Sequence, residues 1–400
     1  IRDSVKVMRR FQAWDELPVL PEGRIGIYVG SHTHFSEKQN RAIDRFCATY
    51  DAVVICDHTS GYYGKYKLLP TLVQLQSDIT SPFPPLDLMV HIGEISAASF
   101  NDTIPAKEVW RVSEDGELRD PFKKLTTVFQ MSEEMFFLHY GKDGCNRHVL
   151  IDECRELFGE IYEQIPELPF CNIWTAMQLS SRLPKGALFH MGVSNTRRCW
   201  NMFQLPESVE SACNVGCCGI DGCVSTLVGA SLVNPDRLCY VVVGDLTFFY
   251  DLNSLGNHHI GTNLRVMLVN NGRGTEFRLG IHHCNVFGDD ADKYMAAAGH
   301  FGNKSPLLVK HYAEDLGFHY LSATTKEEFM TALSNFTNPQ LSDHSMILEV
   351  FTDSKDESEA LYLMSHIQSD AKGMVRSKLK DAVRNVAGDC LLYTSDAADD

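Results

Sequence analysis

The chain has 400 residues, 44% of them hydrophobic, which suffices for two or three domains with a substantial core in each. Its formal net charge of −16 argues against nucleic-acid and anionic-membrane partners, because both bind through basic patches. No apolar run is long enough to span a membrane, and the first residues do not read as a signal peptide. Composition therefore predicts a cytoplasmic protein without a nucleic-acid or membrane partner.

Residues 1–23 lack an initiator Met and end in a Pro- and Gly-containing stretch, so we expect a fragment that begins with a linker. Beyond them, short apolar runs alternate with segments of helical spacing, such as residues 36–50. This alternation indicates a parallel sheet, and residues 24–145 are predicted to form a middle, Rossmann-like α/β domain. Its predicted strands cover 24–30, 52–56, 86–92 and 108–112.

Residues 146–169 predict a connecting helix and linker, because prolines interrupt the helical pattern. A second α/β domain is predicted over residues 170–370. A C-terminal helix over 371–390 and a non-native tail over 391–400 complete the chain. The predicted fold class is α/β, with two doubly wound, mainly parallel sheets. The strands predicted in the second domain cover 187–191, 238–243, 264–269, 319–322 and 346–351, and its helices cover 172–182, 222–232, 248–258, 291–298, 305–316 and 326–335.

The chain has thirteen cysteines and no secretory features, which indicates a reducing compartment and free thiols. The cluster of Cys213, Cys217, Cys218 and Cys223 lacks the Cys-x-x-Cys pairs of zinc or iron–sulfur sites. Small buried thiols on a Gly-rich turn are therefore favoured over a metal site.

Two apolar runs in the second domain end on oxygen-bearing side chains. Residues 238–243 lead through a glycine into Asp245, and residues 264–269 lead into Asn270 and Asn271. The crossover between the runs has room for one helix, so both strand ends open on the sheet edge where α/β proteins bind ligands. A carboxylate and a carboxamide at that edge suit a hard cation such as Mg²⁺ or Ca²⁺ rather than zinc.

This pattern of Gly-Asp, a spacer and Asn-Asn resembles the diphosphate-binding motif of thiamine diphosphate-dependent enzymes. The resemblance extends from about residue 24 to residue 363 and implies that the two domains are the middle and diphosphate-binding domains of such an enzyme. It also implies that Asp245, Asn271 and the main-chain carbonyl of Arg273 hold Mg²⁺, which anchors the cofactor. The alternative interpretation is an Asp at a helix N-cap and an ordinary Asn-Asn-Gly turn.

Residues beside the metal motif are expected to contact the diphosphate. Gly244 precedes the Asp, and the backbone N–H groups of Leu246 and Thr247 lie at a predicted helix start, where they can point at phosphate oxygens. Thr247 adds a hydroxyl donor, or else is an ordinary first-turn residue.

Three glycines precede the helix predicted over 222–232, but their Gly-x-x-Gly-x-x-Gly spacing misses the dinucleotide fingerprint. The resemblance implies that Ile220 supports the cofactor rings in a V shape and that the carbonyl of Gly219 receives the aminopyrimidine. That shape brings the cofactor's amino group next to its reactive carbon, so the protein contributes position and polarity. The alternative interpretation is that Ile220 is an ordinary core residue.

A third segment follows the first strand of the second domain. The resemblance implies that Ser194 faces the cofactor and that Arg198 faces the substrate, where a guanidinium suits a carboxylate because its fork binds both oxygens. A surface arginine on a strand-to-helix turn is the alternative. Glu276 and the pair His282–His283 are interpreted as solvated loop residues.

Within the family, the likeness is strongest to synthases of the menaquinone pathway, and two positions depart from them. Val215 stands where those synthases have an arginine that grips a substrate carboxylate, and Val193 stands where they have an asparagine. A charge-assisted contact is worth about 1.5–3 kcal/mol, so these changes put that substrate in doubt.

The resemblance implies an enzyme that uses thiamine diphosphate and Mg²⁺ on a 2-oxo acid, with decarboxylation and C–C bond formation onto an acceptor, as a transferase or lyase. A homodimer or homotetramer is implied, since this family builds its sites between subunits. No catalytic residue is expected in this chain, because the activating Glu of the family lies in the pyrimidine domain expected before Ile1. The alternatives are a non-catalytic cofactor-binding or regulatory protein of the same fold, and a nucleotide-binding α/β protein.

Overall fold

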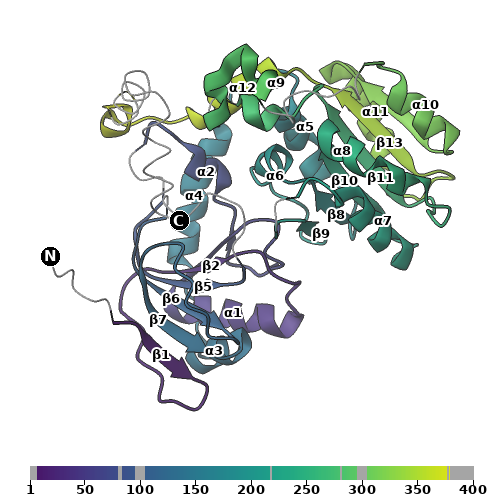
Figure 1. Ribbon diagram of the computed structural model, residues 1–400. Coiled ribbons are helices and arrows are strands. Elements are labelled where there is room, and N and C mark those ends of the chain that lie inside the picture. The colour runs from purple at the N-terminus through teal and green to yellow at the C-terminus, as the bar shows by residue number, and fades with distance from the viewer. Residues whose placement is uncertain are drawn as a thin grey trace. The chain divides into compact units, whose positions relative to one another are not determined.

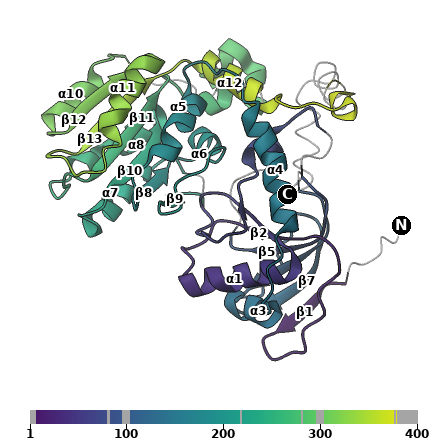
Figure 2. The same cartoon turned by 180° about the vertical axis from the view of Figure 1, so that it is seen from behind.

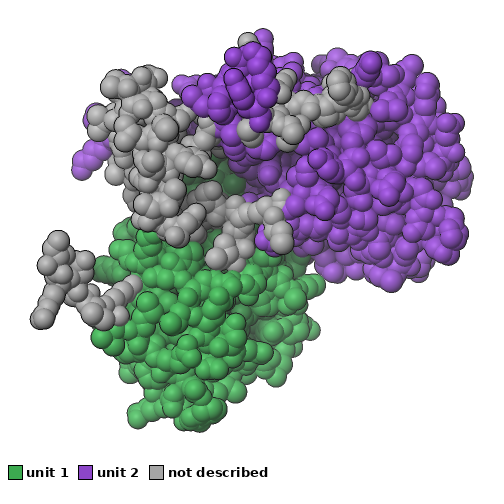
Figure 3. Space-filling view, in the orientation of Figure 1, with its two compact units in different colours: residues 1–75, 81–164 green, residues 76–80, 165–400 purple. Residues whose placement is uncertain are grey.

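The computed structural model describes residues 7–79, 83–94, 104–216, 219–279, 282–294, 304–375 and 378. The chain forms two compact units, one of residues 1–75 and 81–164 and the other of residues 76–80 and 165–400 (Figure 3). Each unit contains one sheet whose neighbouring strands are all parallel. The predicted fold class, α/β with two parallel sheets, is therefore confirmed. The predicted tail over 391–400 and most of the helix over 371–390 lie outside the described residues.

The first unit is built on a seven-stranded sheet in the order β1-β7-β6-β5-β2-β3-β4 (Figure 1). Two of its inner strands, β2 and β3, are apolar runs such as Val-Val-Ile-Cys of β3, and both are buried along their whole length, as expected for a parallel sheet covered on both faces. The elements of this unit are β1 (Arg9–Gln12), β2 (Ile25–Val29), α1 (Glu37–Tyr50), β3 (Val53–Cys56), β4 (Lys67–Leu68), α2 (Thr71–Leu75), β5 (Leu86–Ile92), β6 (Ala106–Ser113), β7 (Leu125–Gln130), α3 (Glu133–Tyr140) and α4 (Val149–Glu163).

The segment predicted as a linker contains a strand, β1, which pairs with β7 at the edge of the first sheet. Phe11 of β1 stacks on Phe129 of β7 with their ring centroids 5.5 Å apart. The strand has four residues, two of them arginines, so no apolar run marked it in the sequence. Pairing with β7, rather than the residue pattern of β1 itself, makes this segment a strand.

The second unit is built on a six-stranded sheet in the order β12-β13-β11-β10-β8-β9 (Figure 2). Its elements are α5 (Asn172–Leu179), η1 (Ser180–Arg182), β8 (Leu188–Met191), α6 (Asn195–Trp200), β9 (Glu210–Cys213), α7 (Cys223–Val233), β10 (Cys239–Gly244), α8 (Asp245–Asp251), η2 (Leu252–Gly256), β11 (Leu264–Asn270), η3 (Thr275–Arg278), η4 (His283–Asp290), α9 (Ala291–Tyr294), α10 (Leu308–Asp315), β12 (His319–Ala323), α11 (Lys326–Phe336), β13 (Met346–Phe351) and α12 (Ser354–Ser365).

Alternate residues of the central strands in the second unit pack against helices on opposite faces of the sheet. Val241 of β10 and Val266 of β11 lie in a core with residues of α7, α8 and α10. Tyr240, one residue earlier on β10, faces the other way and packs on Phe336 of α11. Phe189 of β8 packs in the same manner on Trp200 of α6. Both faces are therefore covered, and a ligand can reach the sheet at its edges.

Candidate functional site

The predicted metal ligand Asp245 follows β10 directly and is the first residue of α8. Its side chain is 2% exposed, and its Oδ1 accepts a hydrogen bond from the Leu246 N–H at 2.8 Å. Thr247, in the same turn, is also buried. The strand-to-helix turn therefore fixes a carboxylate at the carboxyl edge of the sheet.

The second predicted ligand, Asn271, follows the neighbouring strand. β11 pairs in parallel with β10, and the register places Val269 opposite Gly244. Asn271 and Asp245 thus follow adjacent strand ends, which lie about 4.8 Å apart in a sheet. The Asn271 Oδ1 is buried and accepts no hydrogen bond from the residues that the structure describes. A buried oxygen without a donor is costly, and a cation or a ligand donor would relieve that cost.

Asn270, the last residue of β11, hydrogen-bonds through its side chain to a buried acid of the neighbouring strand β13. Its Nδ2 donates to the Glu349 Oε1 at 2.7 Å, and the Tyr320 hydroxyl donates to the other Glu349 oxygen at 2.7 Å. Burial raises the pKa of the Glu349 carboxyl, and the charge of Asp245 adds to that rise. Glu349 is thus a buried acid beside the predicted metal site, and the sequence marked it only as part of an apolar strand.

A glycine bends the chain in the turn after β11. Gly272 has a φ of +80°, in the left-handed region that favours glycine, and it lies between Asn271 and Arg273. At the end of β10, a Cβ built on Gly244 would have no heavy atom within 4 Å beyond its chain neighbours. The edge beside Asp245 is therefore open at the backbone.

The segment after β8 carries the predicted cofactor-facing Ser194 and substrate-facing Arg198. Ser194 has a φ of 60°, an uncommon and strained value for a residue with a side chain, and such strain concentrates at functional sites. The Arg198 guanidinium donates to both carboxylate oxygens of Glu276, at 3.0 and 2.6 Å. Burial opposes the charge of Arg198, but the hydrogen bond and charge of Glu276 raise its pKa overall.

Glu276 was interpreted as a solvated loop carboxylate, and that interpretation is wrong. Its side chain is 20% exposed and forms the two-pronged ion pair with Arg198. The two residues are 78 positions apart in the chain, so no local spacing pointed to the pair. The one available signal was an acid on the segment that follows β11 and an unmatched arginine on the segment that follows β8.

The predicted Gly219–Ile220 segment lies between β9 and α7, and both residues are half-buried. Gly222, at the N-cap of α7, has a φ of +86°, which explains a glycine there. Burial raises the pKa of the Cys223 thiol to about 11, while a hydrogen bond with the Val193 backbone opposes that rise. This contact brings the start of α7 to the carboxyl end of β8.

The cysteine cluster is described only in part, because Cys217 and Cys218 lie outside the described residues. Over the part of the chain that is described, no group of three or more His, Cys, Asp or Glu side chains could hold a metal ion. The predicted Mg²⁺ site is not such a group, because its predicted ligands are one carboxylate, one carboxamide and one main-chain carbonyl.

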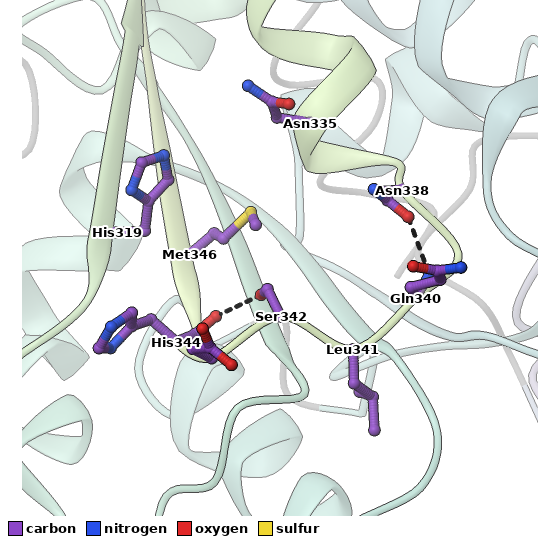
Figure 4. Close-up of a pocket in the computed structure, with 9 residues that line it drawn as sticks. His319, Asn335, Asn338, Gln340, Leu341, Ser342, His344 and Met346 are labelled. Atoms are coloured by element: carbon purple, nitrogen blue, oxygen red, sulfur yellow. Dashed lines mark hydrogen bonds between the residues drawn. The ribbon is translucent and has the colours of Figure 1, made fainter.

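A polar pocket of about 550 Å³ lies at the opposite end of the strands from Asp245. It surrounds the first residues of β12 and β13, His319 and Met346 (Figure 4). Hydrogen bonds within its own loop, from the Gln340 N–H to Asn338 and from Ser342 to the His344 carbonyl, occupy several of its polar groups. It is therefore separate from the predicted site.

Among the residues described, no helix is long and apolar enough to cross a membrane.

No protein-family model matches the chain. Among curated proteins, it is 33% identical over 263 residues to 2-succinyl-5-enolpyruvyl-6-hydroxy-3-cyclohexene-1-carboxylate synthase of Bacteroides fragilis, covering 64% of this chain and 45% of that protein. The synthase of the same name from Phocaeicola vulgatus is 32% identical over 265 residues, covering 64% and 44%. That of Christiangramia forsetii is 33% identical over 199 residues, covering 50% and 33%. The chain thus spans less than half the length of these relatives. The resemblance predicted from the motifs is confirmed: over nearly two thirds of its residues, the chain is related to these synthases.

Proposed function

We propose that this chain is the part of a thiamine diphosphate- and Mg²⁺-dependent enzyme that holds the cofactor's diphosphate. The complete enzyme would act on a 2-oxo acid, with decarboxylation and C–C bond formation onto an acceptor, as a synthase-like transferase or lyase. The observation that carries the proposal is the pair of strand ends at Asp245 and Asn271, beside open backbone at Gly244, in a chain related to the synthases.

The residues at this edge fit a hard cation. Asp245 is a buried carboxylate held in place by the Leu246 N–H, and the Asn271 Oδ1 is a buried acceptor that finds no donor among the described residues. Glu349 adds a second buried carboxyl within electrostatic reach of Asp245. A divalent ion at this edge would be held by Asp245, Asn271 and the carbonyl of Arg273, and would turn a site that repels anions into one that binds a diphosphate.

The remaining residues at this edge would position the cofactor. The backbone of Gly244, with no Cβ, allows close approach, and the N–H groups of Leu246 and Thr247 would bind phosphate oxygens. Ser194, Gly219 and Ile220 would line the ring end. When bound, thiamine diphosphate supplies an electron sink for a carbanion, which these protein groups orient and shield from water.

The substrate side of the site would be completed outside this chain. Arg198 is the chain's candidate for the substrate side, and its fork is engaged by Glu276. We propose that the activating Glu comes from a pyrimidine-binding domain and that the cytoplasmic enzyme is a homodimer or homotetramer. The middle and diphosphate-binding domains would correspond to residues 24–145 and 170–370.

A non-catalytic cofactor-binding protein of the same fold is the second candidate, favoured by one observation. Val193 and Val215, on the segments that follow β8 and β9, are 6% and 7% exposed, so apolar side chains fill two positions near the candidate site. Such a protein would bind the cofactor but not turn over a 2-oxo acid in its full-length form.

The test is calorimetric titration of thiamine diphosphate, with and without Mg²⁺, into the full-length protein, both as wild type and with Asp245→Asn. The substitution removes the negative charge while keeping the shape. Removing a residue that only holds a metal ligand in place weakens metal affinity by about 10–100-fold. Removing a direct ligand should therefore weaken the Mg²⁺-dependent binding of thiamine diphosphate by about 100-fold.

Asp57→Asn is the matched control, because Asp57 is also a buried aspartate that follows a parallel strand, β3 of the other sheet. It should leave the affinity unchanged. Equal affinity of the wild-type chain and Asp245→Asn would refute the metal assignment. Cofactor binding by the full-length protein without decarboxylation of any 2-oxo acid would favour the non-catalytic candidate.

A further inference from the structure

The ion pair between Arg198 and Glu276 is a two-pronged, partly buried contact near the candidate site. Both N–H groups of the guanidinium fork are used, at 3.0 and 2.6 Å from the two Glu276 oxygens, and the side chains are 23% and 20% exposed. Arg–carboxylate pairs with this two-pronged geometry are the strong and directional ones. The pair is therefore unlike the exposed ion pairs elsewhere on the chain, which contribute little.

The pair joins two segments that flank the strand of Asp245. Arg198 belongs to α6, which follows β8, and Glu276 belongs to η3, which follows β11. β10 lies between β8 and β11 in the sheet. The contact thus connects the segments on both sides of the strand that ends at Asp245.

The η3 segment is continuous with the proposed metal turn. η3 begins at Thr275, two residues after Arg273, whose carbonyl is a proposed metal ligand. Its own hydrogen bonds are long, since the N–H groups of Phe277 and Leu279 donate at 3.3 Å. Short 3₁₀ turns with such geometry hold their shape poorly by themselves. The ion pair is therefore a main restraint on the conformation of this turn.

Arg198 is the fixed end of the pair. Trp200 of α6 is fully buried, with its ring centroid 4.8 Å from that of Phe189. The first residue of α6, Asn195, hydrogen-bonds through its side chain to Glu357, a buried acid of α12. The Glu357 Oε1 also accepts the Asn172 N–H at 2.9 Å, which links α12 to α5. Two helices, α5 and α12, thus hold α6 in place.

We propose that Glu276 is a positioning residue, which holds the Asn271–Arg273 turn in its metal-binding conformation by gripping Arg198. The proposal rests on the proposed function for the identity of the metal ligands. It also has a consequence for substrates, because a substrate carboxylate that approaches Arg198 must compete with Glu276 for the same fork.

The test measures Mg²⁺-dependent binding of thiamine diphosphate to the Glu276→Gln and Glu276→Ala variants by calorimetry. Both variants lose the ion pair with Arg198. We expect the Mg²⁺-dependent affinity for thiamine diphosphate to fall by about tenfold, the lower end of the range for residues that hold metal ligands in place. Backbone hydrogen exchange over residues 271–279, measured without cofactor, should become faster in both variants.

Two further variants separate the pair from a general loss of fold. The double variant Arg198→Glu with Glu276→Arg reverses the pair and should recover most of the lost affinity and protection, whereas each single reversal should not. Glu37→Gln is the matched control, since Glu37 pairs with Arg41 at 2.7 Å on an exposed helix face. It should change neither measurement.

The outcomes distinguish this inference from the proposed function. If Asp245→Asn weakens binding and the Glu276 variants do not, Glu276 does not position the turn. If the wild-type full-length protein binds no thiamine diphosphate, the proposed function fails, and the exchange rates still decide whether the pair holds the turn. An effect of Glu276 variants on the KM for a carboxylate substrate in the full-length protein, without any change in cofactor affinity or exchange, would overturn positioning in favour of a role in substrate choice.

Discussion

The two sheets of this chain have the same parallel construction, but their carboxyl edges differ. At the end of β2, a Cβ built on Gly30 would lie 1.7 Å from the backbone oxygen of Glu94, and the Gly30 N–H donates to the Ile92 carbonyl at 3.0 Å. At the end of β10, a Cβ on Gly244 would meet nothing within 4 Å. The first edge is filled by the protein's own backbone, and the second is left open.

The contrast shows that a glycine at a parallel strand end has two different uses. Gly30 allows two backbone segments to meet, so its space is already occupied. Gly244 leaves room beside a buried carboxylate, Asp245, and a buried amide oxygen of Asn271 that accepts no hydrogen bond from described residues. Parallel construction alone therefore does not leave an edge open, and a few residues after the strands decide whether it is filled or open.

The largest effect that could break this comparison is on stability. Gly30→Ala places a methyl group against the Glu94 backbone and should lower the free energy of unfolding by about 3 kcal/mol or more. Gly244→Ala should change it by less than about 1 kcal/mol, because a φ of −76° and ψ of 166° suit any residue and the cap loses little. Urea denaturation of the two variants measures both values.

The same pair of variants should behave in the opposite order in cofactor binding. Gly244→Ala fills the open space and should weaken Mg²⁺-dependent binding of thiamine diphosphate, whereas any Gly30→Ala protein that folds should bind normally. A loss of stability in Gly244→Ala as large as that in Gly30→Ala would mean that the edge beside Asp245 is closed in solution.

A second difference concerns the charge of buried groups, and it predicts an effect of pH on the second unit. Burial raises the pKa of Glu357 from 4.5 to about 7, and the neighbouring Asp356 adds to the rise. Between these values the folded chain holds a proton that the unfolded chain has lost, so this contribution is complete below pH 4.5 and is lost as the pH rises through about 7. Over this pH range the free energy of unfolding falls by about 3 kcal/mol.

Glu357→Gln should remove this contribution, since the amide oxygen can still accept from the Asn172 N–H and the Thr352 hydroxyl but cannot ionise. The measurement is the free energy of unfolding of wild type and variant from pH 4.5 to 8. The free energy of unfolding of Glu357→Gln should rise relative to that of the wild type as the pH rises. For Glu37→Gln, which changes an exposed side chain, the difference from the wild type should not depend on pH. Parallel curves for wild type and Glu357→Gln would show that Glu357 ionises freely in the fold.

Most of the fold could be predicted from the sequence because parallel strands are continuous apolar runs. The run before Asp245 became β10 and the run before Asn270 became β11, in neighbouring positions of one sheet. The strand β1 could not be predicted, because an edge strand with two arginines takes its structure from its partner, β7. Local pattern determines central strands, and tertiary pairing determines edges.

The same division applies to the candidate site. Asp245 and Asn271 were predictable, because each directly follows a strand whose pattern is strong. Glu276 and Glu357 were not, since their partners Arg198 and Asn172 lie 78 and 185 positions away. The positions of polar residues at strand ends are therefore local properties of the sequence, whereas side-chain contacts between distant segments are properties of the packed fold.

The smallest predicted effect is in the first unit and has the opposite pH dependence. Burial lowers the pKa of His91 well below 6.5, and the charges of Arg111 and Arg119 lower it further. The ring packs edge-on to Tyr28 and Phe122, and its nitrogens make no hydrogen bond with described residues. As the pH falls below 6.5, the unfolded chain therefore gains a proton that the folded chain does not, at a cost of up to about 1.4 kcal/mol per pH unit.

His91→Phe keeps an aromatic ring of similar size and cannot be protonated. It should leave stability at pH 7.5 within about 1.5 kcal/mol of the wild type and reduce the loss on acidification to pH 5, both read from urea denaturation. His139→Phe, at an exposed ring on α3, should not change the slope. His91 costs stability as the pH falls below 6.5, and Glu357 costs stability as the pH rises from 4.5 to about 7. The effects of His91→Phe and Glu357→Gln on the free energy of unfolding should therefore add in the double variant at each pH. A change in the double variant that differs from the sum of the two single changes would mean that the two units do not respond to pH separately.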